Sequence, residues 1–581
     1  MRHRPDDPFI PAEEASSLRR ARQYAVPRWM VERATERRLA GDWRGALAVA
    51  GIDAAFDPAR VAAEHGTAVA GALVSDLQHL APDLVRWHLP RVLGGRSTVS
   101  TDRTVVLAGY RDGAGLPLAP YLHLRTPPMV DGPQRLTLDF GAVPGETSPG
   151  VFGSGTEDWR AARYAWDARR TGDLRAAAGI GDRIPFLHPD GTPRAPREPA
   201  PPDRGDAAAR AERVSLLHRD GRVAEAFAAA GVEWDPTPPE SDRSWYRVEP
   251  EKVIASMALD IPRLESGVRR SMAATGTERF RIGAHWRGHV LLELTGHSAG
   301  GRLRASVVEP GTATAAAFLP EVVWRRLPDL DLLRAGRMPA RWLHPLVAGA
   351  LLPALEGPFG APGPSAPRPV RVRCRGDWHE VVFRDGALRS PHTEEERNRE
   401  SAMRAFGGAV AGCFAVEHSC TSGTGRLPRA LRAQRQELFL RVQHGDTPGV
   451  LELLDAGVDL RVRDGRRRGL LHVLHLLDHE ALLPRLLAAG LDLEALDHHD
   501  RTPLGVVVSE GGSAALVRAL LDAGARIDVI DQMELSLAQV IRRYKREDLG
   551  FLRERVLAEH PGIGSDWYDE WQQQKEEDEE Q

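Results

Sequence analysis

The feature that most constrains the fold is a repeat near the carboxyl end of the chain. Three glycines, Gly457, Gly490 and Gly524, stand 33 and 34 residues apart, and each ends a run that contains paired leucines. Because one unit of this kind cannot bury its apolar face alone, at least three units must stack, with atypical units at the ends. We therefore expect an array of paired helices over residues 428–562.

The starts of the helices in this array carry a second signature. Residues 502–504 have the sequence Thr-Pro-Leu, and residues 471–472 supply Leu-His at the same place one repeat earlier. The Thr hydroxyl can cap a helix, and Pro suits the first turn because no amide donor is lost there. These elements resemble the ankyrin-repeat family. Residues 469–470 (Gly-Leu) and Gly505 depart from the family pattern, which has Thr-Pro and His at these places.

The ankyrin resemblance implies an all-α solenoid that binds a protein partner through its hairpin tips and its concave helix face. The tips would be residues 464–468 and 497–501. The run of arginines in the first tip suggests an acidic partner, and the alternative is a solvated loop. The residues that we expect to contact the partner are Arg466, Arg467, Arg468, His498, His499 and Arg501.

The amino-terminal region has a different, α+β pattern. Residues 16–145 predict a helical hairpin, a long helix over 58–80 and β-hairpins. Residues 207–356 match this segment at an offset of 180 residues, which favours an internal duplication, although Ala and Gly are abundant enough for chance identity to be the alternative. The matched pairs include Gly41 with Gly221, Ala46 with Ala226, Gly51 with Gly231 and Pro82 with Pro262.

The remaining segments complete the predicted domain organisation. Residues 146–206 predict a helical segment followed by a Pro-rich linker, 357–369 a Pro/Gly linker, and 370–427 a small βα unit. Residues 563–581 predict an acidic tail without fixed structure. The expected fold class is therefore multidomain, with a duplicated α+β region followed by an all-α ankyrin-repeat solenoid.

Composition excludes several classes of function. The formal charge of −4 and pI near 6.6 give no support for a nucleic-acid partner. The amino terminus has no signal-like apolar core, and the longest apolar runs are too short to cross a bilayer, so we expect no membrane association. Three cysteines cannot form a disulfide framework in a chain of 581 residues, which favours the cytoplasm. The near absence of lysine suggests a GC-rich bacterial genome.

Motifs for catalysis and metal binding are weak. None of the three lysines follows a glycine, which excludes a Walker-type phosphate loop. Two groups of histidines and cysteines contain residue types that can bind a metal, but their positions in the sequence favour a structural role. The sequence therefore predicts no metal, no cofactor and no catalytic residue. The first group is His472, His475 and His479, with His498 and His499; the second is Cys413, His418 and Cys420, with Cys374. In residues 378–380, His379 is expected on the opposite strand face from Trp378 and Glu380.

The leading hypothesis is a cytoplasmic scaffold or adaptor that binds a protein through its carboxyl-terminal repeats. The alternative is an enzyme of unknown class in the α+β region, with the repeat array recruiting its substrate. A cleft with converging carboxylates and perturbed histidines would favour the enzyme. A third hypothesis is nucleic-acid binding through exposed arginines.

Overall fold

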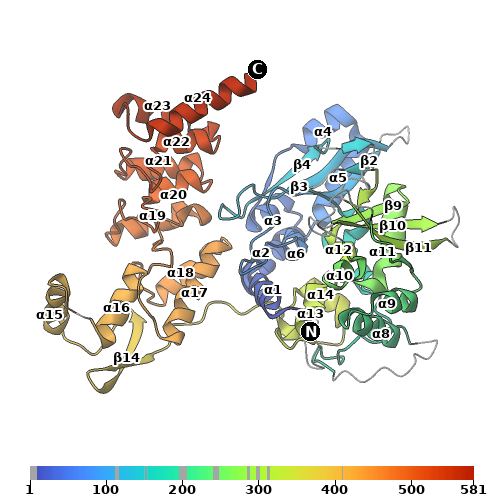
Figure 1. Ribbon diagram of the computed structural model, residues 1–581, viewed down its shortest axis with the longest axis horizontal. Helices are drawn as coiled ribbons and strands as arrows, with labels where there is room; N and C mark the ends of the chain where they lie inside the picture. Colours follow the sequence, from blue (N-terminus) through green and yellow to red (C-terminus); the bar gives the residue numbers. More distant parts are fainter. Residues whose placement is uncertain are drawn as a thin grey trace. The chain divides into compact units, whose positions relative to one another are not determined.

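The chain folds into two compact units, each with its own hydrophobic core. Unit 1 comprises residues 1–130 and 135–362, and unit 2 comprises residues 131–134 and 363–581. The structure is a computed structural model (Figure 1). It describes residues 10–111, 117–144, 146–148, 151–152, 155–194, 206–239, 248–283, 288–295, 301–309, 315–408 and 410–580. Residues 195–205 of the predicted Pro-rich linker therefore lie outside the described residues.

The first half of unit 1 begins with helices and continues with a sheet. The predicted hairpin is formed by two helices, and Asp42 caps the second of them by accepting a hydrogen bond from the Gly45 N–H at 2.8 Å. The predicted long helix is two helices instead, because Gly66 adopts a φ of +88° between them. The helices are α1 (Ala12–Tyr24), α2 (Arg28–Leu39), α3 (Trp43–Val49), α4 (Pro58–His65), α5 (Thr67–His79) and α6 (Pro82–His88). The strands are β1 (Ile52–Ala54), β2 (Thr104–Arg111), β3 (Pro117–Arg125), β4 (Leu136–Gly141), β5 (Glu146–Ser148), β6 (Val151–Phe152) and β7 (Thr156–Asp158).

The second half of unit 1 follows the same order of elements. Two short helical segments join the halves, namely η1 (Trp159–Ala165) and α7 (Asp173–Ala177). The helices of the second half are α8 (Ala207–Arg219), α9 (Val223–Ala230), α10 (Pro250–Ala255), α11 (Ile261–Thr275), α12 (Glu321–Trp324), α13 (Pro328–Arg334), η3 (Ala340–Trp342) and α14 (Pro345–Leu351). Its strands are β8 (Glu233–Asp235), β9 (Arg279–Gly283), β10 (His289–Thr295), β11 (Arg302–Val308) and β12 (Ala317–Phe318).

The two sheets of unit 1 have the same topology. Their orders are β1-β4-β3-β2-β7 and β8-β11-β10-β9-β12. In both sheets the three central strands are antiparallel and each outer strand is parallel to its neighbour. Gly41 and Gly221, which the 180-residue offset pairs, occupy the same hairpin turn with φ of +77° and +75°. The described residues thus contain one arrangement of helical hairpin and sheet twice.

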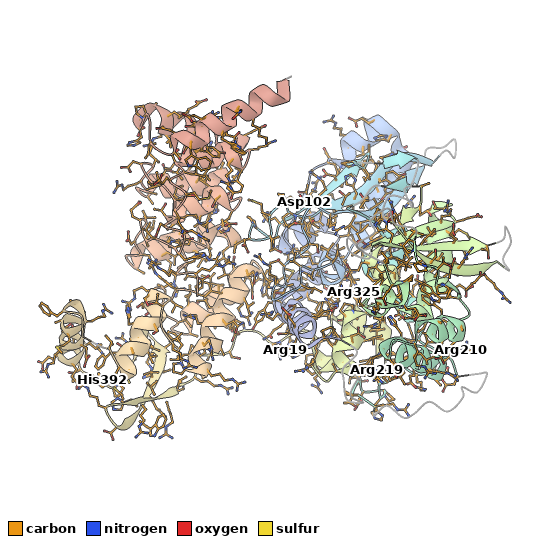
Figure 2. The ribbon with its side chains drawn as sticks, viewed as in Figure 1. Arg19, Asp102, Arg210, Arg219, Arg325 and His392 are labelled. Carbon is orange, nitrogen blue, oxygen red and sulfur yellow. The ribbon has the colours of Figure 1, made fainter. Side chains whose placement is uncertain are left out.

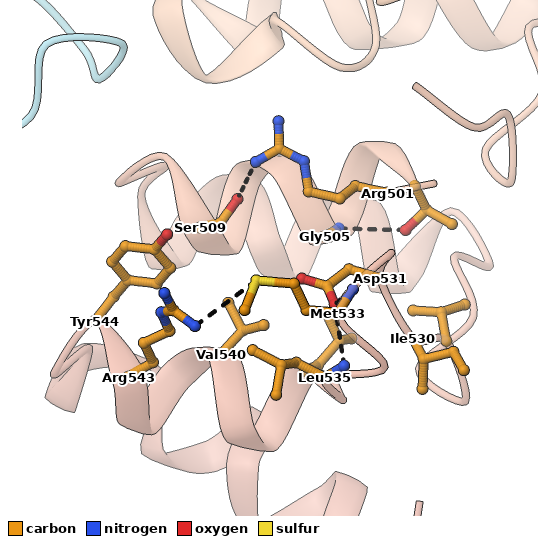
Figure 3. Close-up of a pocket in the computed structure, with 13 residues that line it drawn as sticks. Arg501, Gly505, Ser509, Ile530, Asp531, Met533, Leu535, Val540, Arg543 and Tyr544 are labelled. Carbon is orange, nitrogen blue, oxygen red and sulfur yellow. Dashed lines mark hydrogen bonds between the residues drawn. The ribbon is translucent and has the colours of Figure 1, made fainter. Parts of the chain in front are cut away.

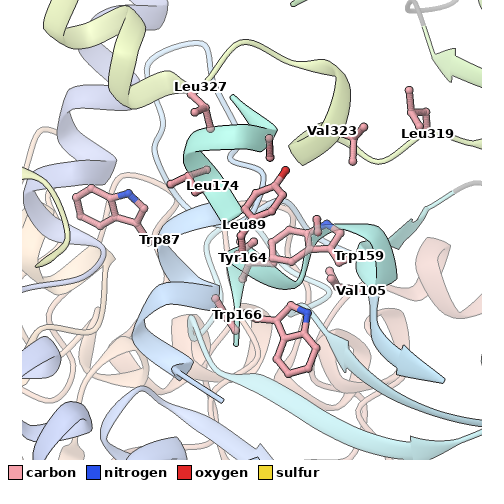
Figure 4. Close-up of a cluster of buried hydrophobic side chains, with 14 of the residues drawn as sticks. Trp87, Leu89, Val105, Trp159, Tyr164, Trp166, Leu174, Leu319, Val323 and Leu327 are labelled. Carbon is pink, nitrogen blue, oxygen red and sulfur yellow. The ribbon is translucent and has the colours of Figure 1, made fainter. Parts of the chain in front are cut away.

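Both halves of unit 1 contribute to a single core. Trp87 from the first half and Trp159 and Trp166 from the connecting segment are at most 1% exposed. They belong to the same apolar cluster as Val323 and Leu327 from the second half (Figure 4). Burial of side chains this large is the main source of stability that such a core has. The two halves therefore fold as one unit.

A buried ion pair crosses this core. The Arg22 side chain on α1 and the Asp329 side chain on α13 are 4% and 0% exposed, and the Arg22 Nε lies 2.7 Å from Asp329 Oδ1. The Arg22 Nη1 also donates to the Trp87 carbonyl at 2.6 Å, and the Trp87 indole N–H donates to Asp329 Oδ2 at 3.3 Å. Each buried charge is thereby paired and hydrogen-bonded, as burial in a low dielectric requires.

Unit 2 combines a small sheet with helices. Its strands are β13 (Val370–Cys374), β14 (Asp377–Arg384) and β15 (Ala387–Arg389), which pair antiparallel in that order. Its helices are α15 (Glu394–Ala405), α16 (Gly412–Ser422), α17 (Arg429–Gln443), α18 (Thr447–Asp455), η4 (Leu474–Leu476), α19 (His479–Ala488), α20 (Pro503–Ser509), α21 (Ala514–Asp522), α22 (Leu537–Arg543), η5 (Glu547–Leu549), α23 (Gly550–Glu559) and α24 (Asp566–Glu580).

The predicted fold class is wrong, because the chain is mixed α and β in both units and does not end in an all-α ankyrin solenoid. Val370, Val381 and Phe383 of the sheet belong to the same apolar cluster as Leu453 of the helices. The strands bury alternate residues, so their apolar face must be covered, and the helices cover it. In one expected repeat the first helix is only the short 3-10 segment η4. The described part of unit 2 therefore forms no solenoid of paired α-helices alone.

The acidic end of the chain is also ordered, contrary to expectation. Residues 566–580 form α24, and Tyr568 is 1% exposed within the unit 2 core. The Gln539 side chain donates to the Ser565 carbonyl and to Asp569 Oδ2, both at 2.9 Å. These contacts anchor a sequence whose charge alone predicted a free tail. Among the described residues, the helices are too short or too polar to cross a bilayer.

The Arg22–Asp329 pair generates a stability prediction. Asp329→Ala leaves the Arg22 guanidinium buried without its counter-charge, so the free energy of unfolding of unit 1 is expected to fall by about 3–5 kcal/mol. Urea denaturation of the full chain followed by tryptophan fluorescence measures the change. Glu32→Ala is the control, because its partner pair with Arg28 is exposed and is worth about 1 kcal/mol or less. Equal effects of the two substitutions contradict the prediction.

Candidate functional site

The candidate site lies in the repeated turns that connect the helical pairs of unit 2. Asp464, Asp497 and Asp531 each begin a turn of the same construction, 33 and 34 residues apart. In each turn the backbone N–H of the aspartate donates to the carbonyl four residues later, at 2.9 to 3.1 Å. Its carboxylate accepts from the N–H groups two and four residues later, at 2.8 to 3.0 Å. Each repeat therefore contains this specific turn as well as a helical pair.

These turns are held rigidly and are joined in a row. The fourth residue of each turn has a positive φ, namely +61° at Arg467, +55° at Asp500 and +60° at Glu534. Non-glycine residues adopt this conformation at some cost, which the aspartate hydrogen bonds offset. The His498 N–H donates to the Arg466 carbonyl, and the Gln532 N–H donates to the His499 carbonyl, both at 3.0 Å. The row of tips is thus organised before any partner binds.

The structure separates the six predicted partner-binding residues into two classes. Arg468 and Arg501 serve the turns: the Arg468 Nη2 lies 2.9 Å from Asp464 Oδ2, and Arg501 pairs with Asp497 and Glu510 at 3.0 Å. Their guanidinium groups are therefore engaged within the fold. The other four predicted residues are more accessible: Arg466, His498 and His499 are exposed and Arg467 is half-buried. The Arg466 Nη1 also lies 3.4 Å from Asp131 Oδ2.

The rings of the two exposed histidines lie against each other at an angle. The rings of His498 and His499 are centred 3.7 Å apart with a tilt of 45°. Partial desolvation and the neighbouring His499 lower the pKa of His498. The His499 Nδ1 lies 3.0 Å from Gln532 Oε1, a carboxamide oxygen that can only accept, so His499 donates. These rings offer a polar aromatic surface beside Arg466.

A pocket open to the surface lies at the third tip (Figure 3). Sequence reasoning did not predict it. Ile530, Met533 and Tyr544 stand at its edge and are 48%, 46% and 43% exposed, which is unusual for side chains of this size. The other lining residues come from the end of the second tip, the cap and body of α20, the third tip and α22. They are Arg501, Thr502, Gly505, Ser509, Val529, Asp531, Leu535, Leu537, Val540 and Arg543.

The pocket occupies the place where neighbouring repeats have a side chain. His472, one repeat earlier, accepts from the Gly469 N–H at 3.2 Å and contacts the Ala495 carbonyl at 2.9 Å. Gln539, one repeat later, makes the same kind of bridge, from the Ser536 N–H to the carbonyl of Ser565. The equivalent residue between them is Gly505, which has no side chain. The departure of Gly505 from the family pattern was therefore the available signal for this pocket.

His472, which belongs to the first group of histidines named in the sequence analysis, has a structural role. His472 is 1% exposed, and burial lowers its pKa to about 4, so it is neutral at pH 7. Its bridge fixes the start of its repeat. The described residues do not gather His472, His475, His479, His498 and His499 into one group of metal ligands.

A different set of possible metal ligands does come together in unit 2. Cys374 and Cys413, two of the cysteines weighed from the sequence, meet His379 and His392, with their donor atoms all within 4.8 Å of one another. His418 and Cys420, which were weighed with them, point elsewhere: the His418 Nδ1 is 2.7 Å from Arg404 Nη1, and Cys420 is buried in the core. Burial raises the pKa of Cys420 to about 12. The sequence spacing of these ligands follows no familiar pattern, which is why the set was missed.

Unit 1 contains a buried histidine–aspartate pair. His344 Nε2 lies 2.8 Å from Asp83 Oδ2, and the two side chains are 1% and 2% exposed. Burial of the ring lowers the pKa of His88, a half-buried residue at the end of α6, to about 3. His344 and Asp83 support α6 and α14 from within the core, where a substrate has no access. Of the residues described in unit 1, they give the enzyme hypothesis no supporting site.

No model of a known protein family matches this chain.

The turns lead to a prediction about pH. Although burial opposes ionisation, hydrogen bonds from Arg501 and His499 and the charge of Arg501 hold the pKa of Asp497 below its ordinary value of 3.8. A depressed carboxyl pKa contributes stability above the ordinary value and loses it as the pH falls through the folded-state value. Asp497→Asn is therefore expected to destabilise unit 2 at pH 7 and to lose little more stability on acidification.

Urea midpoints of the full chain between pH 7 and about pH 3, followed by circular dichroism, test this prediction. Asp500→Asn is the control, because Asp500 is exposed on the same turn and asparagine accepts its left-handed backbone. The gap between wild type and Asp497→Asn should narrow towards low pH. A constant gap over the whole range contradicts the assignment.

Proposed function

We propose that this chain binds a partner protein, and that the pocket at Gly505 accommodates one side chain of that partner. The observation that carries the proposal is the missing side chain at Gly505, because its equivalents His472 and Gln539 fill this place in the neighbouring repeats. Pockets formed by an omitted side chain on a rigid scaffold are suited to receiving a side chain from another molecule.

The chemistry of the pocket favours one kind of occupant. Its walls are apolar, with Val529, Leu535 and Val540 among the lining residues. Arg543 stands at the edge, and its Nη1 contacts the Met533 sulfur at 3.9 Å (Figure 3). Within the described residues, Arg543 forms no ion pair. We therefore propose an occupant with an apolar side chain next to a carboxylate that pairs with Arg543.

The surroundings of the pocket support a protein partner over a small molecule. Exposed Ile530, Met533 and Tyr544 extend the apolar surface beyond the pocket, and residues of these types are common in protein interfaces. The tips with Arg466, His498 and His499 lie along the same row of turns. The ankyrin resemblance of residues 428–562 adds support, since protein binding is the shared property of that family.

We also propose that the chain is a scaffold or adaptor, in which unit 1 binds a second partner. We further propose that the protein is cytoplasmic. The supporting observation is that Cys374, Cys413 and Cys420 are free and buried thiols, which suit a reducing compartment.

Peptide display tests the proposal directly. A library of random peptides is selected on the full chain, and an enriched peptide is synthesised with a fluorescent label. We expect enriched sequences to pair an apolar residue with Asp or Glu. Gly505→His is expected to fill the pocket and to weaken binding by roughly tenfold or more in fluorescence anisotropy, equivalent to about 1.4 kcal/mol. Arg543→Glu should weaken the same peptide through charge repulsion.

Matched variants outside the pocket control this experiment. A Cβ at Gly505 meets only Thr502 and Arg501 at ordinary contact distances, so Gly505→His should fold normally. Gly550→His, at the start of α23 with no atom within 4 Å of a Cβ, and Arg553→Glu, exposed on the same helix, should bind as wild type does. Peptides that bind wild type and Gly505→His equally, or a selection that enriches no peptide, refute the proposed pocket.

A further inference from the structure

Four side chains with lone pairs converge in the small sheet-containing part of unit 2. Cys374 is the last residue of β13, and His379 lies in β14, across the hairpin from Val372. His392, labelled in Figure 2, stands between β15 and α15, and Cys413 is the second residue of α16. Strands β13 and β14, the segment before α15 and the start of α16 thus meet at one point. Cys374, His392 and Cys413 are buried, and His379 is half-buried.

Three distances among the four donor atoms are close to the edges of a tetrahedron around zinc, and all four atoms lie within 4.8 Å of one another. Zinc bonds of about 2.3 Å to sulfur and 2.05 Å to nitrogen give edges of about 3.6 Å between sulfur and nitrogen and about 3.3 Å between two nitrogens. The Cys374 Sγ is 3.4 Å from His392 Nε2, and the Cys413 Sγ is 3.6 Å from His379 Nδ1. The two ring nitrogens, His379 Nδ1 and His392 Nε2, are 3.1 Å apart.

Lone pairs face the centre of this arrangement. The His392 Nδ1 is 3.4 Å from the Glu396 carboxylate, which can only accept, so the proton is on Nδ1 and Nε2 presents a lone pair. The His379 Nδ1 faces that lone pair at 3.1 Å and the Cys413 Sγ at 3.6 Å. A single cation accepts a lone pair from each of the four atoms.

The surroundings hold the ligands in place before a metal binds. Glu396 belongs to the capping box of α15, in which the Thr393 N–H donates to it at 3.0 Å. The Arg397 Nη1 donates to the His392 carbonyl at 2.9 Å. A histidine that donates one ring N–H to a carboxylate while the other nitrogen faces the metal is the usual outer-shell arrangement of metal sites. The orientation of the His392 ring is thereby fixed.

Glycine at position 412 permits the two thiols to meet. Gly412 has a φ of +63°, and a Cβ there would lie 2.5 Å from the Cys374 Sγ and 2.9 Å from the Cys374 Cα. Backbone cannot yield at such a distance, so only glycine allows α16 to begin against the end of β13. This approach brings the Cys413 thiol, which is 0% exposed, beside Cys374.

We propose that Cys374, His379, His392 and Cys413 bind one zinc ion in a closed tetrahedral site that joins the sheet β13–β14–β15 to helix α16. Two thiolates and two imidazoles select zinc among the common divalent metals. All four positions are filled by the protein, so no position is open for water or substrate and the site is structural. It also anchors the start of α15, a helix that buries none of its own residues. The site does not depend on the proposed peptide pocket.

The first test measures metal in the full chain. Protein is produced in zinc-supplemented cells and purified with a reductant and without chelator, and its metal content is determined by plasma mass spectrometry. We expect one zinc ion per chain in wild type and none in the double variant Cys374→Ser/Cys413→Ser. Cys420→Ser is the matched control, because it removes a buried thiol of the same unit outside the site, and it should keep the zinc.

A second test does not depend on the fold of a serine variant. Cobalt added to the metal-free full chain should produce the intense visible absorption of tetrahedral Co²⁺ and a thiolate charge-transfer band. His379→Cys replaces one ligand by another and should still bind one ion, with a stronger charge-transfer band from the third thiolate.

Several results would overturn the proposal. The proposal fails if the wild-type chain binds neither zinc nor cobalt, or if its cobalt spectrum is octahedral. It also fails if the zinc content is equal in wild type and the double variant, or if Cys420→Ser loses its zinc as completely as the double variant. A Cys374–Cys413 disulfide in protein kept under reductant would also contradict the site.

Discussion

The close contact between the start of helix α16 and the end of strand β13 is the constraint on which unit 2 depends. A Cβ at Gly412 would collide with both the side chain and the backbone of Cys374, so the contact exists only because that residue is glycine. Through it the apolar face of the sheet joins the same core as the helical pairs. The sheet is thereby part of the carboxyl-terminal fold rather than an appendage before it, which is why the predicted all-α array is wrong.

The row of turns shows how a repeat can be regular in its backbone and variable in its chemistry. The aspartates at 464, 497 and 531 build three turns with matching hydrogen bonds. The bridging position varies from His472 through Gly505 to Gln539, and only the glycine leaves space behind it. Because the hydrogen bonds of the turns fix the backbone, the residue type at the bridging position can differ without loss of the fold. A rigid frame with one omitted side chain is suited to recognition.

Unit 1 is built differently, because its two copies of one topology share a single hydrophobic core. Trp87 from the first copy and the tryptophans of the connecting segment belong to the same cluster as apolar residues from the second copy. The charge on Arg22 is matched by Asp329 across the copies, inside that cluster. The same burial keeps the His344–Asp83 pair inside the core, where it supports α6 and α14.

The sequence by itself determined the local elements: the period of the leucines and glycines located the helical pairs, and the alternation in residues 370–384 located the hairpin. It also paired Gly41 with Gly221. These patterns are visible because periodicity records which face of each element is buried. Only the tertiary structure shows which elements share a core and that Tyr568 anchors the acidic end. It alone also brings His379 and His392 together with Cys374 and Cys413. Such convergence depends on how closely distant backbones approach, and the missing Cβ at Gly412 permits that approach without leaving any periodic trace.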